Sequence, residues 1–460
     1  MGHVDLESVI ASGRSVATAA VSAAADVAIG ILAEGGNAFD AAVAACLVET
    51  VWLPMKCGLA GDVVALCRCD GGPFRALVSV GPGGAGFAPG QLTLTGPRSI
   101  GVPGAPDGYA ALAKLGRLSL KKIIAPARNM ALTGVTWLPV AVALTAESRE
   151  RLRMYNDAVR FLPNWDLPTV GSKLRLPGLA GLLDAFAQLG SRLFWGDIAT
   201  PLLERVRVGG GLLTAEDLRV NPAQWTEPTR RVFPPEYEVL VTPYPTHGPR
   251  LLRTLELVRC EGLRDLDAVI RAITEDKNAG IDGDGTSVVS AADDAGNAVV
   301  VVHSNSFPQY GSGVVVSEYD LVLNNRAGRG FAVNDHVGEN APAPGRVPRT
   351  TLHAWARTDG AGVFIGATPG GINQTTWNAQ TILATFSTTC DLAQLVLMPR
   401  WAFDSHGESI AEDGHLYAGA AAKRIPYLGL RSATQILRLE HGGMNWAIAD
   451  PRIGAVARAF

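Results

Sequence analysis

Gly285-Thr286 opens a run of strand-forming residues and offers a hydroxyl at a point where the chain could be cut. If the peptide bond before Thr286 were cleaved, the residue would carry its side-chain hydroxyl and a free α-amine. Such an amine has an ordinary pKa of about 7.7 to 8.0, which suits a general base at neutral pH. Thr286 would then supply nucleophile and base together. Taken alone, a threonine that opens a strand is usually structural, because β-branched residues favour strands.

The segment that must position Thr286 is predicted to be a β-hairpin. Residues 286–292 and 298–304 are strand-like, and Asp293-Asp294-Ala295-Gly296 between them has the composition of a turn. Further strands are predicted at residues 61–69, 76–80 and 237–241.

Two Ala-rich segments near the N-terminus are predicted to be helices. Residues 16–32 are too short and too weakly apolar to span a membrane, which takes about twenty strongly apolar residues. Gly35-Gly36 ends this helix, and Asn37 with Asp40 caps a second one that runs to about Thr50. Helices apolar on most sides must be enclosed by other layers, as in a sandwich. Helices are also expected at residues 119–132 and 177–189.

Composition excludes several classes of protein. The 460 residues are 47% hydrophobic, which allows a large core and excludes disorder. A net charge of -3, with scattered charges, gives no basic face for nucleic acid. The six cysteines form no CxxC pair, no metal motif is visible, and the N-terminus lacks an export signal. We expect a cytoplasmic protein with buried thiols, no membrane partner and no metal.

The glycine-rich run at residues 81–86 is not expected to bind a nucleotide. A phosphate loop would open directly into a helix and carry a lysine, whereas Phe87-Ala88-Pro89-Gly90 follows here. A substrate-side loop with close backbone packing is the simpler interpretation. No cofactor is expected.

Six motifs, in order, resemble those of the γ-glutamyltranspeptidase family. The first, residues 35–44, reads Gly-Gly-Asn-Ala-Phe-Asp-Ala-Ala-Val-Ala and is similar to the signature near the start of these proteins. The others lie at residues 101–104, 210–218, 311–315, 323–325 and 366–371. The resemblance implies an N-terminal-nucleophile hydrolase with an α+β fold, a four-layer αββα sandwich. It also implies a precursor that cleaves itself into a large subunit (1–285) and a small subunit (286–460), which form one interleaved domain.

The resemblance places the nucleophile in one of two ways. Matching residues 296–299 to the family's Gly-Asn-Ala-Val puts Thr286 on the nucleophilic threonine without a gap. Matching residues 287–289 to the family's Ser-Val-Val would put Gly283 there and leave no nucleophile. We prefer the first placement, because it leaves a hydroxyl where the chemistry requires one.

Further catalytic positions follow from the same resemblance. Ser304 falls where the family has a threonine that assists self-cleavage and catalysis. Gly370 and Gly371 match the Pro-Gly-Gly whose backbone N–H groups form the oxyanion hole, and glycine suits a backbone that must approach a tetrahedral intermediate.

Substrate-binding positions are expected nearby. Thr350 and Thr351 match paired serines that hold the substrate carboxylate, and Asn305, next to Ser304, is also expected to bind substrate. The stretch between Leu257 and Thr286 is shorter than in typical family members. This favours a divergent member.

Two departures from the family concern the charge of the pocket. Ala85 stands where members that bind a γ-glutamyl group have an arginine, and Arg326 and Arg329 follow Leu-Asn-Asn where the family has an acidic pair. An arginine repels an ammonium group but forms a charge-assisted fork with a carboxylate. We therefore expect an acidic small-molecule substrate, unless both arginines merely point into solvent.

The leading hypothesis is a divergent hydrolase that forms an ester of Thr286 with an acidic acyl group and releases it to water. The resemblance extends to members that hydrolyse a carbon-carbon bond and release oxalate in the assembly of 4-alkylproline antibiotics. An ordinary γ-glutamyl transferase or hydrolase, or an amide acylase of the cephalosporin-acylase type, is the alternative enzyme. An uncleaved, non-catalytic binding protein is the alternative of another class. A homo-oligomer is compatible with the sequence.

Overall fold

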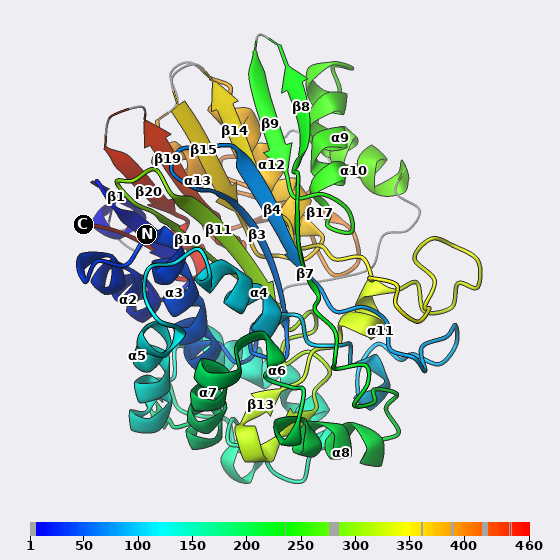
Figure 1. Ribbon diagram of the computed structural model, residues 1–460. Coiled ribbons are helices and arrows are strands. Elements are labelled where there is room, and N and C mark those ends of the chain that lie inside the picture. The colour runs from blue at the N-terminus through cyan, green and yellow to red at the C-terminus, as the bar shows by residue number, and fades with distance from the viewer. Residues whose placement is uncertain are drawn as a thin grey trace.

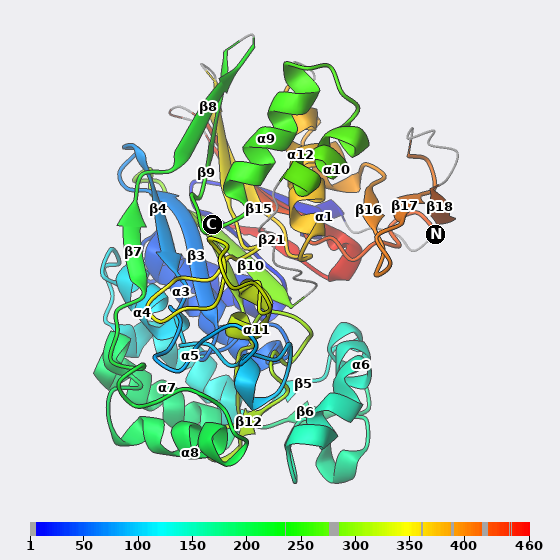
Figure 2. The ribbon, with the colours of Figure 1, turned by 90° about the vertical axis from the view of Figure 1, so that its right-hand side faces the viewer.

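Two facing β-sheets form the centre of the molecule, and helices cover the outer face of each (Figures 1 and 2). The computed structural model describes residues 6–234, 236–275, 285–359, 362–387, 391–415, 422–440, 442 and 444–460. The predicted α+β fold, a four-layer αββα sandwich, is confirmed. Gly283, the alternative position for the nucleophile, lies outside the described residues.

Each sheet has seven strands. The first sheet runs in the order β21 (Val456–Ala459), β2 (Val16–Ala19), β10 (Thr286–Ala292), β11 (Ala298–Ser304), β3 (Asp62–Arg68), β4 (Phe74–Ser79) and β7 (Ala223–Thr226). The second runs in the order β1 (Ile10–Gly13), β20 (Asn445–Ala449), β19 (Gln435–Glu440), β15 (Gly362–Ala367), β14 (Trp355–Asp359), β9 (Tyr237–Val241) and β8 (Thr229–Phe233). Strands from before and after position 286 therefore interleave in both sheets.

The helices form the outer layers and a lobe at one end of the molecule (Figure 2). Their bounds are α1 Leu6–Val9, α2 Ser22–Ala33, α3 Ala38–Trp52, α4 Ala105–Ala113, α5 Leu120–Thr133, α6 Pro139–Tyr155, α7 Pro177–Leu189, α8 Thr200–Val208, α9 Gly248–Arg259, α10 Asp265–Glu275, α11 Arg326–Gly330, α12 Asn373–Thr385 and α13 Gln394–Leu397. Short strand pairs and a three-stranded sheet complete the fold: β5 Val135–Thr136 with β6 Lys173–Leu174, β12 Val315–Val316 with β13 Leu321–Val322, and β16 Trp401–Phe403 with β17 Ser409–Glu412 and β18 Lys423–Ile425.

The β10–β11 hairpin has the bounds that the sequence predicts. Along β10, Val288 and Ala292 pack between the two sheets, whereas Val289 and Ala291 pack on the helical side. Successive side chains alternate between the faces of a strand. The hydroxyl-bearing side chain of Thr286 therefore faces the space between the sheets.

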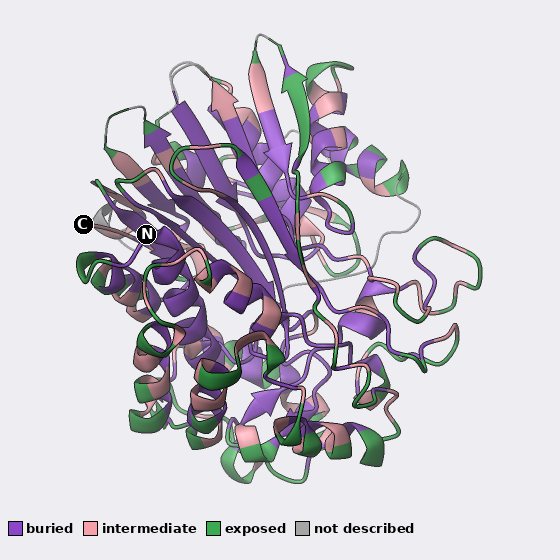
Figure 3. Ribbon diagram, viewed as in Figure 1, coloured by how far each residue is buried: buried purple, intermediate pink, exposed green. Residues whose placement is uncertain are grey.

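Helix α3 is enclosed on all sides, as its sequence predicts, and Figure 3 shows it as buried as the strands. Asn37 and Asp40 form the predicted capping box, and Gly35, with φ +88°, ends the preceding helix. The prediction of one helix over residues 16–32 is wrong at its start. Residues 16–19 form β2, which pairs with β10 on one side and β21 on the other.

The described cysteines differ in how far their thiols are buried. Cys46, Cys57 and Cys67 are buried, as expected, whereas Cys260 is exposed, contrary to the expectation. Within the described residues, no helix combines the length and apolar character that a membrane crossing demands.

The hairpin turn is bonded to the helical layer through Asp293. Its carboxylate accepts the N–H of Ala38 at the start of α3 (2.9 Å) and the backbone N–H groups of Ala295 and Asn297 within the turn (3.0 and 3.1 Å). A carboxylate is favourable at a helix N-terminus, where the backbone N–H groups have no partner within the helix. This contact fixes the hairpin, and with it Thr286, against α3.

We predict that Asp293→Ala lowers the free energy of unfolding by about 3 kcal/mol, because it leaves buried N–H donors unsatisfied. Asp294→Ala, at the exposed neighbouring position, should change it by less than about 0.5 kcal/mol. Denaturant unfolding followed by circular dichroism measures both. Equal stability of the two variants would contradict the role given to Asp293.

Candidate active site

The hydroxyls of Thr286, the first residue of β10, and Ser304, the last residue of β11, face each other at the open end of the hairpin. Thr286 pairs directly with Ser304 in the antiparallel register, and its Oγ1 donates to Ser304 Oγ at 3.3 Å. Ser304 Oγ in turn donates to the carbonyl of Gly285 at 2.7 Å and accepts the N–H of Ser306 at 2.8 Å. The contacts form a chain that ends on the peptide bond between Gly285 and Thr286.

This arrangement suits attack of Thr286 on the preceding carbonyl. Such an attack builds negative charge on the Gly285 oxygen, and the Ser304 hydroxyl already donates a hydrogen bond to that atom. A side chain at Gly285 would not fit, because its Cβ would lie 1.9 Å from the carbonyl oxygen of Ser306. Thr286 and Ser304 are each 1% exposed in the uncut chain, so bulk water is held away from the hydroxyls.

Gly370 and Gly371 lie between β15 and α12 in conformations that favour glycine. Their φ angles are +127° and +56°, and a Cβ on Gly370 would lie 2.3 Å from the Trp377 ring. Among the described residues, neither backbone N–H has a hydrogen-bond partner. Two donors of this kind are what an oxyanion hole requires.

Thr350 and Thr351 lie beside this turn. The N–H of Thr350 donates to the carbonyl of Pro245 at 3.0 Å. The amide of Gln374 donates to the carbonyls of Thr351 (3.1 Å) and Thr368 (3.3 Å), and its oxygen accepts the Thr351 hydroxyl at 3.1 Å. Gln374 therefore connects the threonine pair to the segment that carries the two glycines.

Register places these segments at the same end of the second sheet. Trp355 at the start of β14 pairs with Gly366 near the end of β15 and with Val241 at the end of β9. The residues before β14, after β15 and after β9 therefore meet there.

Arg326, in α11, is bonded to the first sheet. Its Nε donates to Asp62 Oδ2 at 2.8 Å, and both side chains are fully buried. Asp62 pairs with Ser304 in the first sheet. Arg326 therefore does not point into solvent, and its guanidinium binds β3, which is separated by β11 from the proposed nucleophile on β10. Its contact with a substrate carboxylate stays a prediction.

Arg329 is half-buried, and its guanidinium carbon lies 5.4 Å from the centre of the Phe307 ring. Burial, with the charge of Arg329 added to it, lowers the pKa of Arg151 to about 10. Arg329 therefore contributes positive charge to a partly enclosed region. Ala85, in contrast, is exposed, and its N–H donates to Asp217 Oδ1 at 2.8 Å.

Asn305 is buried against the loop before β3 rather than beside the threonine pair. Its side-chain amide donates to the carbonyl of Pro54 at 3.3 Å, and its backbone N–H donates to that of Lys56 at 2.8 Å. These contacts hold the end of β11 in place. Its binding of substrate stays a prediction.

Sequence reasoning gave no role to two histidines that are buried at this end of the sandwich. His247 follows β9, and His353 precedes β14. His353 Nδ1 donates to the carbonyl of Thr351 at 2.7 Å, and its Nε2 accepts from the Asn378 amide at 2.9 Å. Burial lowers the pKa of His353 to about 4, so the ring is neutral at pH 7. The feature of the sequence that could have indicated a role for His247 is its position in the loop between a predicted strand and the following helix.

One buried cluster has the residue types of a metal site. The ligand atoms of Glu49, Cys57 and His303 lie within 4.8 Å of one another. However, His303 Nε2 already contacts Glu49 Oε2 at 2.8 Å, and its Nδ1 contacts the Tyr109 hydroxyl at 2.7 Å. These hydrogen bonds join β11 to α3 and α4. His303 lies on the opposite face of β11 from Ser304, and we assign the cluster a structural role.

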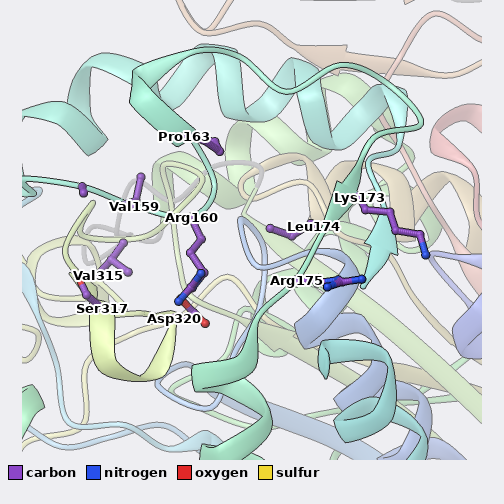
Figure 4. Close-up of a pocket in the computed structure, with 10 residues that line it drawn as sticks. Val159, Arg160, Pro163, Lys173, Leu174, Arg175, Val315, Ser317 and Asp320 are labelled. Carbon is purple, nitrogen blue, oxygen red and sulfur yellow. The ribbon is translucent and has the colours of Figure 1, made fainter. Parts of the chain in front are cut away.

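A surface pocket of about 590 Å³ is lined by residues other than these (Figure 4). Its lining includes Arg160, Lys173 and Arg175, and Arg160 pairs with Asp320 at 2.8 Å. None of the lining residues is among the predicted site residues. This pocket therefore does not change the assignment of the candidate site to the surroundings of Thr286.

Comparisons with known proteins agree with the fold and the motifs. Oxamate amidohydrolase proenzyme from Klebsiella pneumoniae is 25% identical over 98% of this chain and 99% of that protein, and glutathione hydrolase proenzyme from Escherichia coli is 24% identical over 93% and 89%. The match to glutathione hydrolase 2 from Arabidopsis thaliana, 28% identical, covers 56% of this chain and only 46% of that protein. The structure of cephalosporin acylase from Bacillus halodurans superimposes with a TM-score of 0.83 at 24% identity, over 98% of this chain and 97% of that one.

The family described as gamma-glutamyltranspeptidase matches residues 24–274 and 267–418, which include the hairpin, the threonine pair and the two glycines. The relatives are hydrolases and acylases, several of them made as proenzymes. The chain is therefore a member of the γ-glutamyltranspeptidase family and an enzyme of the N-terminal-nucleophile hydrolase type.

Proposed function

We propose that the chain cleaves itself between Gly285 and Thr286 and then uses Thr286 as an N-terminal nucleophile. The hydrogen bond from Ser304 to the Gly285 carbonyl carries this proposal, because it prepares that carbonyl for attack by the adjacent Thr286 hydroxyl. The proenzyme relatives support a precursor that yields large and small subunits, here residues 1–285 and 286–460.

Cleavage proceeds by an acyl shift. Thr286 Oγ1 bonds to the Gly285 carbonyl carbon, the C–N bond breaks, and the Oγ1 proton goes to the released nitrogen. Water then hydrolyses the ester, which leaves a carboxylate on Gly285 and a free amine on Thr286.

The mature amine acts as a general base on its own hydroxyl, either directly or through one water molecule. Oγ1 attacks the acyl carbon of the substrate, and the N–H groups of Gly370 and Gly371 stabilise the oxyanion. The leaving group departs with the proton, and water releases the acyl group from Thr286. Thr350 and Thr351 hold the substrate beside the two glycines.

The substrate class is an acyl group that carries its own carboxylate, of the oxalyl type. Two observations support it: the arginines at positions 326 and 329, and the relative that acts on oxamate, the monoamide of oxalic acid. We propose that the bond cleaved is a carbon-carbon bond in a biosynthetic intermediate of antibiotic metabolism, and that the enzyme works in the cytoplasm.

Hydrolysis of an oxalyl amide is the second candidate, favoured by the match to oxamate amidohydrolase over nearly the full length of both chains. A γ-glutamyl substrate fits less well, because its ammonium group would meet the positive charge of Arg326 or Arg329. An uncleaved binding protein would leave the Thr286–Ser304–Gly285 arrangement without a use.

Purified wild-type protein should give two bands on a denaturing gel. Dividing 48.2 kDa as 285 and 175 of 460 residues gives products of about 30 kDa and about 18 kDa. Thr286→Ala should give one band, whereas Ser287→Ala, which removes the neighbouring hydroxyl on the opposite strand face, should still be cut. A single wild-type band, with activity that survives Thr286→Ala, would remove Thr286 from the mechanism.

Ser304→Ala should slow cleavage by about 10² to 10³-fold, the usual cost of one oxyanion donor. Ser304→Thr keeps the hydroxyl and should restore most of the rate. The time course of band conversion after rapid purification measures both rates. If Ser304→Ala is cut as fast as wild type, the contact with the Gly285 carbonyl has no role in cleavage.

The cleaved enzyme should prefer oxalyl substrates to γ-glutamyl substrates by at least about tenfold in kcat/KM, which corresponds to about 1.4 kcal/mol. The assay compares oxamate and an oxalyl-bearing ketone with a chromogenic γ-glutamyl anilide. Rapid turnover of the anilide would contradict the proposed preference for acyl groups that carry a carboxylate.

A further inference from the structure

His247 has a buried hydrogen-bond donor without a partner. The residue is 2% exposed and lies between β9 and α9. Its Nδ1 lies 3.1 Å from Arg250 Nη1, and a guanidinium can only donate, so Nδ1 is the acceptor. In the neutral ring the proton therefore sits on Nε2, and among the described residues this atom has no hydrogen-bond partner. A buried N–H without a partner is costly and asks for an explanation.

The surroundings of His247 favour an anion over a cation. Burial holds the pKa of His247 well below its usual value, and neighbouring charges lower it further. Those charges come from Arg250, Arg349 and Arg326. Asp62 pairs with Arg326, and the guanidinium of Arg349 lies 5.2 Å from the Tyr244 ring. The neutral imidazole therefore presents its N–H in a positively charged environment, where a carboxylate gains and an ammonium loses.

His247 lies next to the proposed substrate position. Thr246 forms a parallel bridge with Thr350, and the Thr350 N–H donates to Pro245. Arg326 binds Asp62, Asp62 pairs with Ser304 in the first sheet, and Ser304 pairs with Thr286. His247 therefore lies close to the threonine pair and to Arg326.

We propose that His247 Nε2–H donates a hydrogen bond to the carboxylate of the substrate and so selects acyl groups that carry one. This inference rests on the proposed function for the identity of the site, and it adds a neutral donor to the two arginines expected from the sequence. A neutral donor forms a hydrogen bond with a preferred geometry and adds no charge, so it orients the carboxylate that the arginines attract.

The test uses oxalate as the probe and titration calorimetry as the measurement. His247→Asn places an amide near Nδ1 and should weaken oxalate binding by about 10- to 100-fold, the range for a hydrogen bond to a charged group. His247→Gln can place an amide N–H near Nε2 and should bind within about threefold of wild type. His406→Asn, at an exposed histidine, is the matched control and should bind as wild type does. Unchanged binding in His247→Asn, or no binding of oxalate by wild type, overturns the proposal.

A second measurement covers the case in which His247→Asn does not fold. The ring nitrogens of wild type, observed by ¹⁵N NMR, should show a neutral histidine protonated at Nε2, and oxalate should shift that N–H signal. A signal that stays in place at saturating oxalate overturns the proposal.

Failure of the two proposals gives different results. Both binding measurements need no turnover, so they remain informative if Thr286 proves not to be the nucleophile. If the enzyme hydrolyses oxamate and KM for oxamate is the same in His247→Asn as in wild type, the proposed function stands and the role of His247 does not. A rise in KM with kcat little changed is the expected pattern for lost binding.

Discussion

The hydrogen bond from Ser304 to the Gly285 carbonyl is the contact on which the proposed chemistry depends. It forms only if β10 and β11 pair in a register that puts Thr286 opposite Ser304, and a slip of one residue would turn every side chain of the strand to the other face. The turn at Asp293 and its bond to α3 hold that register at the far end of the hairpin. The strands between are buried on both faces, so the helices on one side and the second sheet on the other exclude alternatives.

A buried ion pair lies beside this contact. Asp62 and Arg326 form a fully buried pair, and removing one partner of such a pair commonly costs about 3 to 5 kcal/mol. Arg326 therefore has a structural role. Any contribution that it makes to substrate binding is made while its guanidinium is paired with Asp62. Among the described residues, the Gly370 and Gly371 N–H groups and His247 Nε2 have no hydrogen-bond partner, so they remain available to a substrate.

Local pattern predicted the hairpin well, because two Val-containing runs flank a turn with Asp and Gly and all of these residues lie within twenty positions of one another. It failed at residues 16–19, where Ala and Val are compatible with helix or strand and only pairing with β10 and β21 decides. The candidate site residues follow from family motifs, and the structure brings two of them, Thr286 and Ser304, into contact. Asp62 was missed and His247 was given no role, because their importance arises from segments far apart in sequence, brought together where the two sheets end.

The interleaving of the sheets changes the meaning of stability once the chain is cut. Neither product contains a complete seven-stranded sheet, since β10 and β11 lie between β2 and β3, and β14, β15, β19 and β20 lie between β1 and β9. Folding of the intact chain is unimolecular, whereas recovery of the cut protein from its unfolded products is a second-order reaction that slows with dilution. The mature enzyme would then persist through a high barrier to separation rather than through a reversible equilibrium. Self-cleavage late in folding would make maturation a one-way step.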